Sequence, residues 1–182
     1  MTTPLINQTR EFMYKQARLL ECQLFRALFE DGAREPVLAA LRAYQNSDGG
    51  FGNALEPDLR TPASQPLAVE RAFFVLDAIN AFDDPMVLKA CDWLDEHSTA
   101  DGGVPFALPT LEGYPHSPWM QADNKAAQLN PTASLCTYLM KQQQSDGGWP
   151  INWVALSPAA EAEWRGARTI DALNTLKAYG VL

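Results

Sequence analysis

The tripeptide Asp-Gly-Gly occurs three times in this chain, at residues 48–50, 101–103 and 146–148. Glycine adopts the positive φ that stops a helix sharply, because it has no Cβ to clash. The aspartates are 53 and 45 residues apart, and each interval has room for two helices with their connections. The spacing therefore predicts a repeated pair of helices joined by sharp turns.

The residues that flank these turns suggest how each turn is held. An aspartate in a turn can accept hydrogen bonds from nearby backbone amides. Gln45 and Gln144 precede two of the turns and offer further polar groups. Phe51 and Trp149 follow the same two turns and can pack in the seam between helices. We therefore interpret the turn first as a structural device.

Proline marks three further helix starts. Asp84, Asn130 and Ser157 each stand directly before a proline, and all three residue types are good N-caps. Together with the turns, these signals predict helices over residues 8–30, 35–46, 65–82, 85–98, 131–144 and 158–179. No segment is predicted to be a strand, so the expected fold class is all-α.

Composition favours one domain built from layers of helices. The chain has 182 residues, of which 47% are hydrophobic and 20% are charged, which is enough to bury a core in a single domain over residues 1–182. Residues 19–29 and 69–82 are apolar on more than one helical face. Helices of this kind must be sandwiched between neighbours, which indicates layered helix packing.

Charge and chain ends limit the expected partners and location. A formal charge of −8 and a pI near 4.7 would repel nucleic acid and anionic membrane surfaces. A membrane span needs about 18 consecutive apolar residues, and no such run occurs. Because the N-terminus lacks the basic and apolar segments of a signal peptide, we expect a cytoplasmic protein.

Cysteine is scarce. Cys22, Cys91 and Cys136 are an odd number at long spacings, which suits neither a disulfide framework nor a structural zinc site. We expect buried free thiols, no bound metal and no cofactor.

The turns also carry a family resemblance. Residues 45–52, Gln-Asn-Ser-Asp-Gly-Gly-Phe-Gly, and residues 144–149, Gln-Ser-Asp-Gly-Gly-Trp, resemble the Gln/Trp-type repeats of the terpenoid cyclase and protein prenyltransferase superfamily. Residues 52–60 and 64–66 resemble bacterial squalene-cyclase-like proteins of unassigned activity. The resemblance implies an αα-toroid, in which inner helices surround an apolar cavity that holds an isoprenoid chain in the enzymes.

The chain has room for roughly half of such a ring, which in the family contains about twelve helices. Half a ring would leave helical flanks unpaired and a concave apolar face in water, which is unfavourable at about 25 cal/mol per Å². A partial toroid that forms a homodimer and so closes the ring is therefore expected. The resemblance also implies an isoprenoid-like apolar ligand.

The motifs that carry chemistry in this superfamily are missing. Cyclases that protonate an alkene use Asp-x-Asp-Asp, and the nearest approach here is Glu-Pro-Asp at residues 56–58. The Asp-Asp pair at residues 83–84 lacks the third aspartate of a magnesium-binding helix. Within residues 91–97 only Cys91 and Asp95 share a helical face, which is too few ligands for zinc. Whether the chain is an enzyme therefore stays open.

Polar residues gather after the first turn and in a proline-rich segment at about residues 105–130, which we expect to be a long ordered loop. If the two segments converge at a cavity mouth, their carboxylates could act as a catalytic pair beside an arginine that binds an anion. The candidate catalytic residues are Glu56, Asp58 and Asp123. The aromatic candidates could also stabilise a carbocation. The candidate ligand-binding residues are Arg60, Asn53, Trp119, His116, Asn124 and Phe73.

A simpler interpretation competes for several of these residues. Asp58 and Arg60 can form a surface ion pair that orders the loop, and most aromatic residues of an all-helical repeat belong to the core. Three functions are open: an isoprenoid-binding or isoprenoid-transforming protein, a non-catalytic helical scaffold that binds protein, and a carbohydrate-active αα-toroid enzyme. They predict a deep apolar pocket, no pocket, and an open groove lined by acids and tryptophans, respectively.

Overall fold

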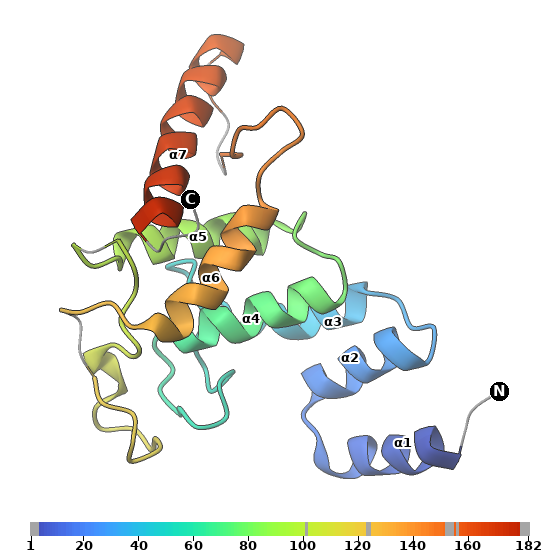
Figure 1. The fold of residues 1–182 in the computed structure, drawn as a ribbon. Coiled ribbons are helices and arrows are strands. Elements are labelled where there is room, and N and C mark those ends of the chain that lie inside the picture. Colours follow the sequence, from blue (N-terminus) through green and yellow to red (C-terminus); the bar gives the residue numbers. More distant parts are fainter. Residues whose placement is uncertain (1–3, 101, 123–124, 152–154, 156, 179–182) are drawn as a thin grey trace.

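The computed structural model describes residues 4–100, 102–122, 125–151, 155 and 157–178 (Figure 1). Within these ranges the backbone forms seven α-helices, one short 3₁₀ helix and two isolated β-bridges, but no strand. The prediction of an all-α chain is confirmed for the described residues. The helices are α1 (Pro4–Gln16), α2 (Leu19–Phe29), α3 (Glu35–Arg42), α4 (Pro66–Ala78), α5 (Pro85–Glu96), η1 (Pro109–Leu111), α6 (Leu129–Lys141) and α7 (Pro158–Ala178).

Five of the six predicted helices are present with somewhat different ends, and the remaining one is divided. The segment predicted as one helix over residues 8–30 forms α1 and α2, because the backbone is extended at Arg18, with φ −72° and ψ 164°. The Arg18 guanidinium donates to the backbone oxygens of Ala54, at 2.8 Å, and Leu55, at 3.1 Å. This contact with a distant loop accompanies a break that no local glycine or proline marks.

The three Asp-Gly-Gly turns share one hydrogen-bonded geometry. The first glycine of each turn has a positive φ: 92° at Gly49, 84° at Gly102 and 87° at Gly147. The amide two residues before the aspartate donates to the carbonyl of the second glycine each time: Asn46 to Gly50 at 2.9 Å, Thr99 to Gly103 at 2.7 Å, and Gln144 to Gly148 at 2.9 Å. The predicted sharp stop after a helix is confirmed.

The side chains of the turns act largely as predicted. The Asp48 carboxylate accepts from Gly50 N at 3.0 Å, and the Asp146 carboxylate accepts from Gly148 N at 3.1 Å. Asp101 of the second turn lies outside the described residues. The rings that follow, Phe51 and Trp149, are both buried.

One flanking glutamine is different from the prediction. Gln45 Nε2 donates to Gly49 O at 2.9 Å, as a residue preceding the turn should. In the third turn the corresponding donor is Gln143, which binds Gly147 O at 2.9 Å, and not Gln144. Gln143 and Gln45 each lie three residues before the aspartate of their turn. Gln144 contributes only its backbone amide, which donates to Gly148 O.

Two of the three predicted N-caps form with their side-chain hydrogen bonds. The Asp84 carboxylate accepts from Met86 N at 3.0 Å, and the Ser157 hydroxyl accepts from Ala160 N at 3.2 Å. Asn130 has non-helical backbone angles inside α6, with φ −100° and ψ 123°. These extended angles directly before Pro131 are those of an N-cap, but the Asn130 side chain makes no capping hydrogen bond within the described part of the chain, so the position of the cap is confirmed and its side-chain bond is not.

The helices pack around one main core. α2 lies against α3, α4 contacts both α5 and α6, and α6 contacts α7 (Figure 1). The largest buried side chains of this core include Leu20, Leu41, Phe51, Phe73, Leu76 and Trp93. A second, smaller cluster lies among the loops that precede α4 and α6, and consists of Leu59, Leu67, Ala107, Leu111 and Met120.

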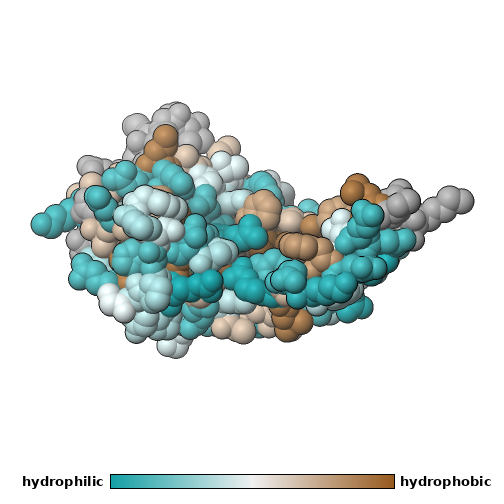
Figure 2. Space-filling model, turned by 90° about the horizontal axis from the view of Figure 1, so that it is seen from below, coloured by the Kyte–Doolittle hydropathy of each residue, from teal (hydrophilic) through white to brown (hydrophobic). Residues whose placement is uncertain are grey.

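The first two helices form an arm at the edge of the molecule (Figure 1). Hydrophobic side chains are exposed along this arm, as Figure 2 shows. Phe12 is 62% exposed, Leu19 is 66% exposed and Phe29 is 59% exposed. None of the helices in the described ranges combines the length and the apolar character that crossing a bilayer requires.

Candidate functional site

The two polar segments singled out in the sequence lie side by side. Arg60 N donates to Pro115 O at 2.9 Å, and Ser117 N donates to Asp58 O at 3.0 Å. Leu59 and His116 thereby form an antiparallel bridge. The loop after the first turn and the proline-rich segment therefore meet through their backbones, which is the condition that the sequence left open.

A buried glutamine fixes this junction. Gln65 is fully buried, and its side-chain amide donates to Thr110 Oγ1 at 2.7 Å and to Leu108 O at 3.3 Å. Its side-chain oxygen accepts from Leu108 N at 2.8 Å. The hydroxyl of Thr61 adds a bond to Thr110 O at 2.8 Å. Sequence reasoning missed both residues, although a glutamine directly before the proline that starts α4 was a signal of a special position.

Asn53 is used to hold the fold. Asn53 and Ala54 both have a positive φ, at 55° and 60°, which is costly for residues that carry a Cβ. The Asn53 side chain donates to Asn46 Oδ1 at 2.9 Å, and its backbone amide donates to Pro62 O at 3.3 Å. The candidate ligand-binding amide of Asn53 is therefore engaged inside the loop.

The candidate carboxylates differ in their surroundings. Glu56 is half-buried, and this burial raises the pKa of its carboxyl above the ordinary value of 4.5, with the nearby charge of Asp58 acting in the same direction. Asp58 and Arg60 are both exposed. Their side chains form no ion pair with each other in the described structure, so the simple surface pair considered for them is not formed. Asp123 and Asn124 lie outside the described residues.

The two ring-bearing candidates of the proline-rich segment lie on the surface. Trp119 is 61% exposed and contacts Phe106, with ring centroids 5.8 Å apart. His116 is exposed, and its Nδ1 lies 2.7 Å from the backbone oxygen of Tyr114. Together with Asp58 and Arg60, these side chains form a polar surface at the loop junction.

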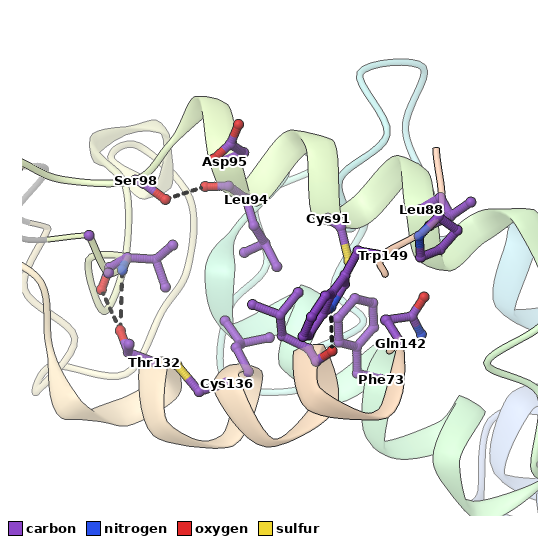
Figure 3. Close-up of a pocket in the computed structure, with 16 residues that line it drawn as sticks. Phe73, Leu88, Cys91, Leu94, Asp95, Ser98, Thr132, Cys136, Gln142 and Trp149 are labelled. Atoms are coloured by element: carbon purple, nitrogen blue, oxygen red, sulfur yellow. Dashed lines mark hydrogen bonds between the residues drawn. The ribbon is translucent and has the colours of Figure 1, made fainter. Parts of the chain in front are cut away.

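A pocket of about 100 Å³ lies elsewhere, between α4, α5 and α6 (Figure 3). Of the seven candidate residues that the structure describes, Phe73 alone lines it. The apolar part of its lining consists of Phe73, Leu88, Leu94, Val104, Leu135, Leu139, Trp149 and Pro150. Its remaining lining residues are Cys91, Asp95, Ser98, Gly102, Gly103, Thr132, Cys136 and Gln142. The indole of Trp149 donates to Leu139 O at 3.0 Å, which fixes the ring against α6.

Two thiols face this pocket from opposite helices. Cys91 belongs to α5 and Cys136 to α6, and burial raises the pKa of the Cys136 thiol above its ordinary value of 9.0. Asp95 lines the pocket together with Cys91, as expected for two residues on one helical face. Among the described residues no group of three or more histidine, cysteine, aspartate or glutamate side chains is placed to hold a metal ion.

Sequence reasoning located the loop junction but not this pocket. Leu94, Leu135 and Leu139 have the periodicity of ordinary core positions, and nothing in the pattern distinguishes a packed core from one with a hollow. The arrangement can therefore do two things: present polar groups at the loop junction, and enclose an apolar group between the helices. No protein-family model matches the chain, and no curated protein or solved structure matches it either.

Proposed function

We propose that this protein binds an apolar small molecule, of the isoprenoid type, in the pocket between α4, α5 and α6. The observation that carries the proposal is a hollow of about 100 Å³ whose lining includes four leucines, a phenylalanine and a tryptophan. Protein interiors are close-packed, so a hollow of this size among apolar side chains is uncommon and suited to an apolar ligand.

The size of the hollow limits the ligand. An apolar cavity of about 150 Å³ is enough to bind benzene, which has six carbon atoms, so this smaller pocket can enclose about one isoprene unit. Asp95 and Ser98 are exposed while they line the pocket, which means that it reaches the surface. A longer chain would therefore insert one end and leave the remainder outside.

The lining favours binding over turnover. Cyclisation initiated by protonation needs a strong acid aimed at the ligand. Asp95 is the one carboxylate among the described lining residues, and it is exposed to solvent. Glu56, whose pKa is raised by burial, lies at the loop junction and does not line the pocket. We therefore propose a binding protein and not a cyclase.

Geraniol, which contains two isoprene units, provides the test. We expect the chain to bind geraniol in calorimetric titrations, and Leu94→Phe to weaken that binding by at least about tenfold, because the added ring atoms occupy space that the ligand needs. Leu28→Phe is the matched control, since Leu28 is 43% exposed on α2 and does not line the pocket. Absence of binding, or equal affinities for all three proteins, would contradict the proposal.

We further propose that two copies of the chain associate through the arm formed by α1 and α2. The supporting observation is the exposure of Phe12, Leu19 and Phe29 on this arm. Exposed apolar side chains that cluster on one part of a surface are typical of an interaction site. A twofold partner would cover both arms with the same surface.

A further inference from the structure

The side chain of Gln142, in the pocket, has no hydrogen-bond partner among the described residues. Gln142 follows the last residue of α6, is only 9% exposed and lines the pocket. Figure 3 shows it at the end of the pocket where Leu88 and Trp149 also lie. Its backbone amide donates to Leu139 O at 3.0 Å. Its side-chain amide makes no hydrogen bond with any described residue.

The other uncharged polar side chains of the lining are already satisfied. The Ser98 hydroxyl donates to Leu94 O at 2.9 Å. The Thr132 hydroxyl donates to Val104 O and accepts from Val104 N, both at 3.2 Å. The amide atoms of Gln142 are not among the described side-chain atoms that are both fully shielded from solvent and unpartnered, so they keep some contact with solvent. Gln142 is thus the uncharged side chain of this lining whose donors and acceptor are available to a ligand.

The turn itself does not require a glutamine at this position. Gln143 makes the side-chain bond to Gly147 O that Gln45 makes to Gly49 O in the first turn. The residue at the position of Gln142 in the first turn is Tyr44. The amide of Gln142 is therefore not part of the repeated turn geometry.

Charge limits what this amide can bind. The described lining residues include no lysine or arginine, and Asp95 is the one charged side chain among them. An anionic head such as a diphosphate would lose its hydration here beside a carboxylate and without a compensating cation. An uncharged head with a hydroxyl or carbonyl group meets no such penalty.

We infer that the ligand of this pocket is an amphiphile, with an apolar chain and an uncharged polar head that hydrogen-bonds to the side-chain amide of Gln142. The inference rests on the proposed function and deepens it, because it selects prenyl alcohols and related neutral compounds over prenyl diphosphates. Gln142 is then a specificity-determining residue of the site.

Three probes with the same carbon skeleton test this inference: geraniol, the corresponding hydrocarbon without the hydroxyl group, and geranyl diphosphate. With the wild-type chain, we expect geraniol to bind most tightly in calorimetric titrations. Gln142→Leu should weaken geraniol binding by about 3- to 10-fold, the effect of one lost hydrogen bond, and leave hydrocarbon binding unchanged. Gln144→Leu is the matched control, because Gln144 is exposed and contributes only its backbone amide.

The outcomes separate this inference from the proposed function. If geraniol and the hydrocarbon bind with equal affinity, or geranyl diphosphate binds most tightly, the neutral-head inference is overturned while the apolar pocket stands. If neither geraniol nor the hydrocarbon binds, the proposed function fails and the inference fails with it. The comparison of probes on the wild-type chain decides the question even if Gln142→Leu does not fold, which circular dichroism would reveal.

Discussion

The first glycine of two of the turns has the same left-handed backbone in different surroundings. Gly49 has φ 92° and Gly147 has φ 87°. A Cβ added to Gly49 would lie 2.6 Å from the backbone oxygen of Lys89, on α5. A Cβ added to Gly147 would meet no atom within 4 Å. Both Gly49 and Gly147 therefore allow the left-handed backbone of the turn, but of these two only Gly49 is also closely packed.

This difference predicts unequal effects of one substitution. Gly147→Ala should lower the free energy of unfolding by about 1–2 kcal/mol, the cost of placing a Cβ in the left-handed region. Gly49→Ala should lower it by at least about 3 kcal/mol, because the new methyl group also clashes with backbone that cannot move aside. Urea denaturation of both variants measures the two effects. Equal losses would show that the packing of Gly49 against Lys89 does not matter.

The backbone conformation of the turns could be predicted from their sequence, but the individual side-chain contacts could be predicted only in part. The positive φ of the glycines follows from their own chemistry, so Asp-Gly-Gly was sufficient to predict it. The roles of Gln143 and Gln144 depend on one position of register, which the sequence gives only when the two turns are aligned residue by residue. Asn130 has the backbone of an N-cap without the side-chain hydrogen bond, whereas Asp84 has both.

At the scale of elements, the third turn is tied to α7 by an ion pair. Arg165 donates to the Asp146 carboxylate at 2.7 Å, and Thr169 Oγ1 accepts from Trp149 N at 3.1 Å. The hydrogen bond from Arg165, together with the weaker effect of that from the Gly148 amide, lowers the pKa of Asp146 from its ordinary value of 3.8 to about 2. The attachment of α7 should therefore depend on pH.

The sign of this dependence follows from the lowered pKa. A carboxylate with a depressed folded-state pKa stabilises the fold above its unfolded pKa, and this contribution is lost as the pH falls through the folded value. The stability difference between wild type and Arg165→Met should therefore be constant above about pH 5 and should shrink progressively as the pH falls through about 2. Denaturation of both proteins across that range measures it. A difference independent of pH would exclude the Asp146 pair as its cause.

Helices were predicted correctly where local sequence signals mark their ends. The break between two helices was missed where a contact with a distant loop determines it. Proline and cap residues located the starts of α5 and α7, so those predictions needed no tertiary information. The break between α1 and α2 occurs at Arg18, which is held by the carbonyls of Ala54 and Leu55. No pattern within residues 8–30 contains that contact.

At the scale of the molecule, the exposed arm predicts self-association. The chain has a mass of 20.1 kDa, and we expect light scattering at micromolar concentration to give about twice that mass. Leu19→Lys should return the mass to that of one chain, because it places a charge in the proposed interface. Trp119→Lys is the matched control, since Trp119 is equally exposed but lies on the loop junction and not on the arm. A wild-type monomer would contradict the proposed dimer.

The sequence identified the residues of the loop junction but not the lining of the pocket. The sequence raised the convergence of the two loops only as a condition, and backbone hydrogen bonds such as that from Arg60 to Pro115 fulfil it. The resemblance implied an apolar cavity, but its position and lining could not be predicted, because the pocket exists only where side chains of three helices fail to fill the space between them. Phe73 was named as a ligand contact among the aromatic residues, and among the described candidates it alone lines the pocket.

The most direct test of the account is where geraniol contacts the protein. Intermolecular nuclear Overhauser effects between geraniol and methyl groups labelled in leucine would report the contacts of the bound ligand. The account predicts signals to Leu94, Leu135 and Leu139, which line the pocket. Contacts confined to Leu59 and Leu111, in the small cluster at the loop junction, would contradict it and would place the binding site there.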